Sequence, residues 1–89
     1  MTWREAAAKF AKAFDIPVGD LLGRSHAKAF AYPRHALFLF LKEELQWGTV
    51  LIGRRLGRDH STVQSGCKAA LKRMHTSPDF AERYRRACQ

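Results

Sequence analysis

Cysteine and long apolar runs are scarce in this chain, and each shortage excludes a class of protein. Only Cys67 and Cys88 occur among the 89 residues, too few and too far apart for a disulfide framework or a zinc site. We interpret them as a buried small hydrophobic residue and a thiol near the C-terminus, which fits the cytosol. The longest apolar run covers residues 36–41, whereas a membrane-spanning helix needs about 20 residues. The N-terminal residues lack the hydrophobic core of a secretion signal, so we expect a cytoplasmic protein without a membrane partner.

Signatures of catalysis and of cofactor binding are also missing. No Gly-Lys-Ser/Thr sequence is present, which argues against a phosphate-binding loop for nucleotides. Asp59 and His60 are adjacent, so their side chains do not face one another, and no nucleophile is paired with them. The four histidines form no i,i+4 pair that could hold a metal; they are His26, His35, His60 and His75. We therefore expect no enzyme activity, no cofactor and no metal.

Positive charge is what the chain has in excess. Sixteen lysines and arginines stand against eight acidic residues, which gives a net charge of +8. The second half is the more basic, with nine basic and three acidic side chains in residues 45–89. Such an excess favours a polyanionic partner. Nucleic acid is the leading partner class, ahead of an acidic membrane surface.

Apolar periodicity predicts one all-α domain of about five helices over residues 1–89. Thr2-x-x-Glu5 has the spacing of an N-terminal capping box, and Ser77 followed by Pro78 is typical of a helix start. Pro33 is interpreted in the same way, as the first residue of a central helix that is apolar nearly all round. The expected helices cover residues 2–14, 33–46, 50–56, about 60–75 and a last segment after Ser77, with a short turn at 18–22 and a loop at 23–32.

A helix-turn-helix is the strongest local pattern. A short helix ends at Gly57, and the heptad of residues 58–64 begins the next helix. In this motif the first residues of the second helix meet base edges in the DNA major groove. Asp can accept a hydrogen bond from cytosine, and His, Ser and Thr can contact base edges, a methyl group or a phosphate. We expect base contacts from Asp59, His60, Ser61 and Thr62, although Asp and Ser are also ordinary helix caps.

The remainder of this helix is expected to have two faces. Its inward stripe is predicted to comprise Val63, Cys67, Ala70, Leu71 and Met74. The polar and basic face opposite the stripe comprises Ser61, Ser65, Lys68 and Lys72.

Two further groups are candidate DNA contacts. The loop before Pro33 has basic side chains at alternate positions, Arg24, His26 and Lys28, which can reach phosphates or the minor groove or form a solvated connector. Arg34 and His35 follow Pro33 in the expected first turn of the central helix, where a phosphate is also favoured by the free amides.

These residues resemble the C-terminal DNA-binding domain of the bacterial chromosomal replication initiator DnaA. The resemblance is carried by Ile52-Gly53, Leu56-Gly57 and Arg58-Asp59-His60-Ser61-Thr62-Val63, preceded by Tyr32-Pro33-Arg34-His35-Ala36, and it extends over most of the chain. It implies an all-α fold that binds a short, asymmetric duplex site of the DnaA-box type. It further implies that Asp59, His60 and Ser61 read bases while Arg58, Thr62, Arg34 and His35 hold phosphates.

The chain departs from the family pattern at three positions. One glycine, Gly57, stands before the Arg-Asp-His motif where the family usually has two. His26 lies where the basic loop usually offers an arginine to the minor groove, and Tyr32 replaces the usual arginine before proline. We expect no ATPase domain, and therefore a monomeric regulator of replication initiation or transcription that binds double-stranded DNA. The alternative is an interaction module that keeps the fold and contacts a replication or regulatory protein.

Overall fold

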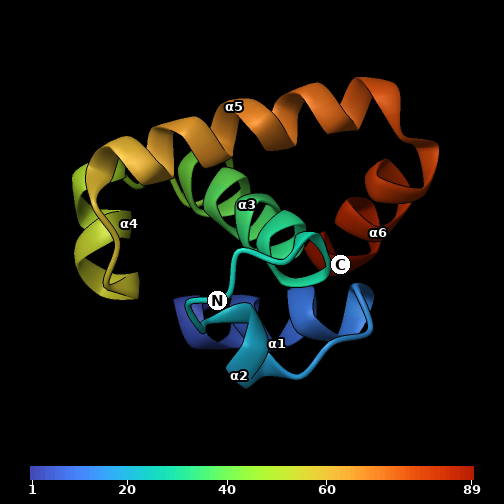
Figure 1. Ribbon diagram of the computed structural model, residues 1–89, viewed down its shortest axis with the longest axis horizontal. Coiled ribbons are helices and arrows are strands. Elements are labelled where there is room, and N and C mark those ends of the chain that lie inside the picture. Colours follow the sequence, from blue (N-terminus) through green and yellow to red (C-terminus); the bar gives the residue numbers. More distant parts are fainter.

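Six helices and no strand make up the computed structural model, which describes residues 1–89. Helix α5 runs along one side of the molecule, with α4 at its N-terminal end and α6 at its C-terminal end (Figure 1). Helices α1 and α2 lie on the opposite side, and α3 passes between the two layers. The all-α prediction is confirmed, with one helix more than expected. The helices are α1 (Trp3–Ala13), α2 (Val18–Leu21), α3 (Lys28–Glu43), α4 (Thr49–Leu56), α5 (His60–Thr76) and α6 (Pro78–Cys88). None of them is both long enough and apolar enough to cross a membrane.

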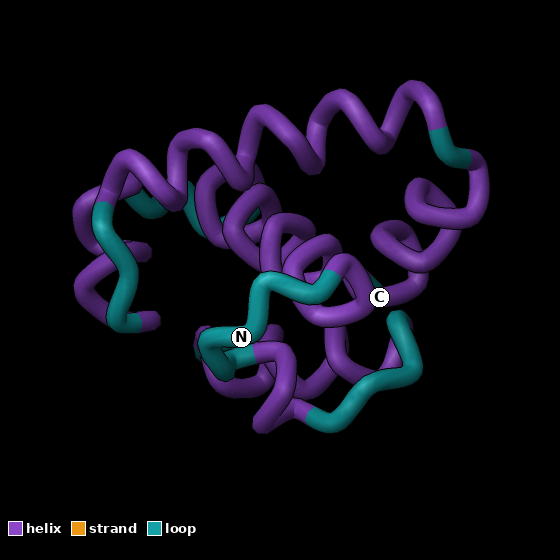
Figure 2. Tube along the Cα trace, in the orientation of Figure 1, coloured by secondary structure: helices purple, strands orange, loops and turns teal.

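Local capping signals set several helix ends, and the connections between helices are short (Figure 2). At the start of α1 the Thr2 hydroxyl accepts a hydrogen bond from the Glu5 amide at 3.1 Å, and the Glu5 carboxylate accepts one from the Thr2 amide. At the start of α6 the Ser77 hydroxyl accepts from the Phe80 amide at 3.2 Å, and Pro78 occupies the first helical position. Both predicted caps are confirmed.

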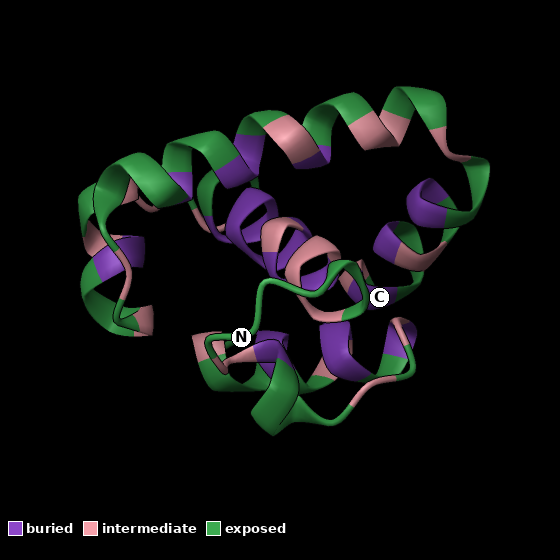
Figure 3. Cartoon of the chain, in the orientation of Figure 1, coloured by how far each residue is buried: buried purple, intermediate pink, exposed green.

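Helix α3 forms the centre of the core because its residues 36–41 are buried on every side (Figure 3). It packs against α1, α2, α4 and α5. Phe10 of α1 lies between aromatic rings of two other helices, with centroids 5.3 Å from Phe40 and 5.5 Å from Tyr84. The segment predicted as a short turn at 18–22 contains the helix α2, and its residue Leu21 is also fully buried.

The predicted start of α3 at Pro33 is wrong. The helix begins at Lys28, after Ala27, so Pro33 lies inside it. A proline there leaves the carbonyl of the residue four positions earlier, Ala29, without its helical partner. Ala29 is exposed, so water can take the place of that amide. The helix also ends earlier than predicted, at Glu43, because Gln46 adopts a left-handed conformation (φ 59°) that turns the chain away.

The inward stripe of α5 differs from the prediction at two positions. Val63, Cys67 and Ala70 are buried as expected, but Leu71 is 50% exposed. Gly66, which was not assigned to the stripe, lies against α3 instead. A Cβ atom at Gly66 would lie 2.7 Å from Cδ2 of Phe38 and 2.9 Å from Cδ2 of His35. The absence of a side chain at this position therefore sets how closely α5 approaches α3.

Replacing Gly66 by alanine should destabilise the protein. We expect Gly66→Ala to lower the free energy of unfolding by up to about 2 kcal/mol, because overpacking costs roughly 1 to 3 kcal/mol and the better helix propensity of alanine returns about 1. Gly19→Ala in α2 is the matched control, since no atom lies within 4 Å of a Cβ atom placed there. Urea denaturation followed by circular dichroism measures both, and equal stabilities of the two variants would contradict the close packing.

Candidate nucleic-acid interface

The connection between α4 and α5 is a tight turn built on glycine. Gly57 has φ 68° and ψ 38°, the left-handed conformation that favours glycine after a helix. The Arg58 amide then donates a hydrogen bond to the Gly53 carbonyl at 2.7 Å. A Cβ atom at Gly53 would collide with the carbonyl oxygen of Arg58. Both glycines are thus needed for the turn, and the predicted helix-turn-helix geometry is present.

The polar residues at the start of α5 are exposed and are organised around Asp59. Asp59 holds the N-cap position, but its carboxylate makes no hydrogen bond to a backbone amide of the helix. The carboxylate instead accepts a hydrogen bond of 2.6 Å from the Ser61 hydroxyl. The Ser61 bond, helped by the nearby amides of His60 and Ser61, lowers the pKa of Asp59. Nδ1 of His60 lies 3.5 Å from the same carboxylate. Asp59 is therefore ionised at neutral pH and presents free acceptor positions to the surroundings.

Along α5 the predicted polar face lies outward. Ser61, Ser65, Lys68 and Lys72 are all exposed, and the outer surface of α5 is exposed along its length (Figure 3). Beside this face is an open hollow of about 430 Å³ between α5 and α3. Its lining consists of His35, Ser61, Thr62, Ser65, Gly66 and Ala69. The structure thus brings His35 together with the hydroxyl groups of the first two turns of α5.

His35 is half-buried and uncharged at neutral pH. Burial, followed by the charges of Arg73 and Arg34, lowers its pKa to about 4. Nδ1 of His35 lies 3.1 Å from Nη1 of Arg73. A guanidinium can only donate, so Nδ1 must be the acceptor and the imidazole proton is on Nε2. His35 therefore carries one N–H donor and no charge.

Arg34 does not occupy the position that was predicted for it. It is only 6% exposed, and its guanidinium donates to the backbone carbonyls of Leu21 (2.7 Å), Ser25 (2.9 Å) and Asp20 (3.0 Å). The prediction that Arg34 contacts a phosphate is therefore wrong, because its guanidinium is buried and already bound to backbone carbonyls. The error follows from the helix start, because Arg34 lies well inside α3 and not in its first turn.

Arg58 is likewise bound to backbone carbonyls. It is half-buried, and its Nη2 donates to the carbonyls of Gly23 and Leu22, while Nη1 lies 3.4 Å from the Leu56 carbonyl. The predicted role of Arg58 as a free phosphate ligand is therefore corrected in the same sense. Its guanidinium connects the helix-turn-helix to the loop that follows α2.

The basic loop lies beside the turn. Arg24 and His26 are exposed, and Lys28 is exposed at the first position of α3. A Cβ atom at Gly57 would lie 3.5 Å from Nη2 of Arg24, so this side chain reaches the glycine turn. Of the three predicted loop residues, Arg24 thus lies beside the start of α5, whereas Lys28 lines a pocket with Tyr32 and Arg73 further along the molecule.

Comparison with known proteins agrees with this geometry. Residues 7–69 match the family described as the bacterial dnaA protein helix-turn-helix. The chain belongs to this family. Among its relatives, the chromosomal replication initiator protein DnaA of Neisseria meningitidis is 33% identical over 75 residues, which are 83% of this chain and 14% of the relative. The protein of the same name in Treponema pallidum is 36% identical over 68 residues, 75% of this chain and 15% of the relative. The chain thus spans about one seventh of the length of these curated relatives.

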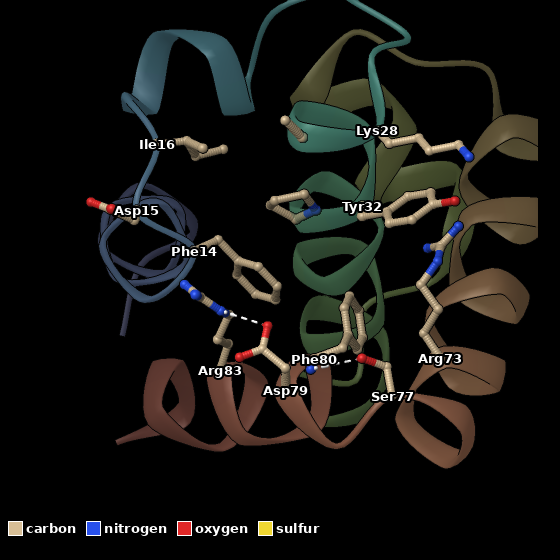
Figure 4. A pocket seen from close by; sticks show the side chains of 12 residues that line it. Phe14, Asp15, Ile16, Lys28, Tyr32, Arg73, Ser77, Asp79, Phe80 and Arg83 are labelled. Atoms are coloured by element: carbon tan, nitrogen blue, oxygen red, sulfur yellow. Dashed lines mark hydrogen bonds and ion pairs between the residues drawn. The ribbon is translucent and has the colours of Figure 1, made fainter.

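The DnaA helix-turn-helix match ends at Ala69, and the residues beyond it help to form a second surface feature. A pocket of about 650 Å³ lies between the end of α1, the start of α3 and the junction of α5 with α6 (Figure 4). The guanidinium carbon of Arg73 lies 3.3 Å from the ring centroid of Tyr32, and Lys28 points toward the same side. Tyr32, which replaces the family's arginine, thus packs against a cation.

Sequence reasoning did not single out two exposed arginines of this DnaA-type motif. Arg54 and Arg55 lie in the last turn of α4, immediately before the glycine turn. Their position just before Gly57, in the more basic half of the chain, could have identified them as candidate DNA contacts.

The buried imidazole predicts a pH dependence of stability. The pKa of His35 is near 6.5 in the unfolded chain and about 4 in the fold, so its contribution is complete above pH 6.5 and is lost as the pH falls toward 4. We expect His35→Gln to lose stability less steeply than the wild type in this window. Urea denaturation at a series of pH values measures this. His75→Gln, at an exposed position of α5, should keep the wild-type steepness, and parallel curves for all three proteins would contradict the prediction.

Proposed function

We propose that this chain binds double-stranded DNA sequence-specifically, with the first turn of α5 in the major groove. The observation that carries the proposal is the exposed polar group at the start of α5, where Asp59, His60, Ser61 and Thr62 stand free of the core. Capping alone does not account for it, because the Asp59 carboxylate bonds to the Ser61 hydroxyl and not to a helix amide. The net charge of +8 over the whole chain supplies the attraction to the phosphate backbone.

Base reading falls to the first three residues of the group. The ionised Asp59 can accept a hydrogen bond from cytosine N4, and His60 and Ser61 can contact neighbouring base edges or a thymine methyl group. Such contacts carry sequence information, whereas contacts to phosphate set the position of the protein on the duplex.

Phosphate contacts fall to the side chains around this reading group. Thr62 and Ser65 line the hollow beside α5, and His35 offers its N–H donor there. Lys68 and Lys72 extend the exposed face toward the C-terminal half of α5. A phosphate in the hollow would meet one uncharged imidazole donor and the hydroxyl groups of Ser61, Thr62 and Ser65.

The basic loop supplies the second point of contact. Arg24 lies next to the turn, and His26 and Lys28 are exposed further along the chain; these side chains can enter the minor groove or bind its phosphates. Arg24 adopts the role of the charged group, since His26 stands where the family usually has arginine.

The names of the relatives suggest the biological setting. They are chromosomal replication initiators, and on this similarity we propose a site of the DnaA-box type and a role in regulating replication initiation or transcription. The protein would act as a monomer on DNA. Residues 1–89 contain no Gly-Lys-Ser/Thr sequence, so their proposed activity is DNA binding without ATP hydrolysis.

One observation favours a second function, the binding of a replication or regulatory protein. Leu71 on α5 and Val50 on α4 are 50% and 57% exposed, and large apolar side chains of this kind are common in protein interfaces. Failure of the protein to shift any duplex at physiological salt would favour this second function.

Substitution of base-reading and phosphate-binding residues should have different effects. After the preferred duplex has been selected from a random pool, Asp59→Ala and His60→Ala should each weaken its binding by about 5- to 150-fold, with a smaller effect on random duplex. Lys68→Ala should weaken both duplexes similarly and reduce the slope of log K against log salt by about one unit. Titrations at several salt concentrations measure both quantities.

Thermal melting must accompany these titrations, because Asp59 holds the N-cap position of α5. Arg85→Ala serves as the charge control, since Arg85 lies on α6 and pairs with Glu82. Folded Asp59 and His60 variants that discriminate between the duplexes as well as the wild type would refute the reading role.

A further inference from the structure

Two arginines bind the same short segment of backbone from two different elements. Arg34 of α3 donates to the carbonyls of Asp20, Leu21 and Ser25. Arg58, in the turn before α5, donates to the carbonyls of Leu22 and Gly23. Between them they occupy five of the six carbonyls in residues 20–25, and the one omitted belongs to Arg24. Neither guanidinium has a carboxylate within salt-bridge distance.

Taking these two guanidinium groups out of water costs free energy, and the groups that bind them must compensate for it. A guanidinium taken out of water loses hydration that only strong hydrogen bonds can replace. Burial lowers the pKa of both side chains, and each also lies near another positive charge, Arg58 beside Arg34 and Arg24 beside Arg58. Two of the carbonyls that they bind belong to the last residues of α2, Asp20 and Leu21, and the other three belong to the loop that follows it. The Asp20 carbonyl also accepts a hydrogen bond from the Gly23 amide at 3.3 Å. Charge-assisted hydrogen bonds to such carbonyls are stronger than neutral ones.

The planar shape of arginine is essential to this role. Arg34 reaches three carbonyls with three different nitrogen atoms, Nε, Nη1 and Nη2. A lysine ammonium is a compact charge on a flexible stem and lacks the rigid fork that makes these bonds together. Lysine at either position would keep the charge and lose the geometry.

We propose that Arg34 and Arg58 are positioning residues that fix the basic loop in register with the recognition helix α5. The proposal rests on the proposed function in one respect only, that the loop contacts DNA. Because Arg34 belongs to α3 and Arg58 to the helix-turn-helix, the loop is attached to both elements that border the interface. The side chains of Arg24 and His26 then point to solvent from a backbone that cannot shift freely. Contacts in the minor and major grooves need such a fixed spacing.

Limited trypsin digestion tests the attachment without DNA. Trypsin cleaves after Arg24 when the loop opens and after Lys68 only when α5 unfolds. In Arg34→Lys and in Arg58→Lys we expect the ratio of cleavage after Arg24 to cleavage after Lys68 to rise about tenfold or more, since charge-assisted hydrogen bonds to the loop are lost. A purely structural role would raise both rates together and leave the ratio unchanged, which would overturn the proposal.

A second variant and a control complete the digestion experiment. Arg58→Lys changes a half-buried side chain, so it provides a folded variant if Arg34→Lys does not fold. Arg85→Lys is the control, because Arg85 lies exposed on α6, at the other end of α5 from the turn (Figure 1). This control should show the wild-type cleavage ratio.

A double-mutant cycle on DNA affinity tests the consequence for binding. Arg24→Ala should weaken binding clearly in the wild-type background and by less than about twofold in the Arg34→Lys background, where the loop is already displaced. Equal losses in both backgrounds would show that Arg34 does not act through the loop. If the wild type binds no duplex, the proposed function fails, while the trypsin ratio still decides whether the two arginines hold the loop.

Discussion

Helix α3 is apolar on every side along residues 36–41, which are all buried, and this constraint determines where the other helices lie. A helix that is apolar all round must be covered by neighbours on every face, and in this chain α1, α2, α4 and α5 provide the cover. Helix α5 can cover α3 only with its inner stripe, and Gly66 permits the close approach. Its outer face and its first turn are left exposed by the same packing. The candidate interface is thus the part of α5 that the core does not need.

The burial of Arg34 and Arg58 is a consequence of the small size of the domain and of its helix α2. A domain of this length buries only part of the surface that its unfolded chain exposes, and α2 has only four residues, so most carbonyls in residues 20–25 have no helical partner. Arg34 and Arg58 satisfy these carbonyls from the inside. Their burial removes two positive charges from the exposed surface. In the proposed binding mode, the chain would thus have two fewer phosphate ligands and a more firmly attached loop.

Local signals predicted much of this structure, and tertiary effects account for the errors. Residues close in the sequence determine the caps at Thr2 and Ser77 and the left-handed conformation of Gly57. The sequence alone was therefore sufficient to predict these helix ends. The start of α3 carries no side-chain cap, and the position of Pro33 was misleading because buried neighbours stabilise a helix around it. Likewise, the periodicity of α5 could not reveal that Gly66 would face α3. The burial of Arg34 depends on carbonyls of residues 20–25, which no helical pattern could indicate.

The negative charge of Asp59 sets the proposed interface apart from a simple basic surface. In a chain of net charge +8, an ionised and exposed carboxylate at the start of α5 repels the phosphate backbone and lowers nonspecific affinity. This cost is offset only where a base-edge donor such as cytosine N4 lies opposite the carboxylate. In the proposed binding mode, the lysines of the outer face would attract any duplex, whereas Asp59 would penalise registers that place no donor there. The Ser61 hydroxyl already bonds to this carboxylate in the free protein, so less orientation of the acceptor would be needed when DNA binds.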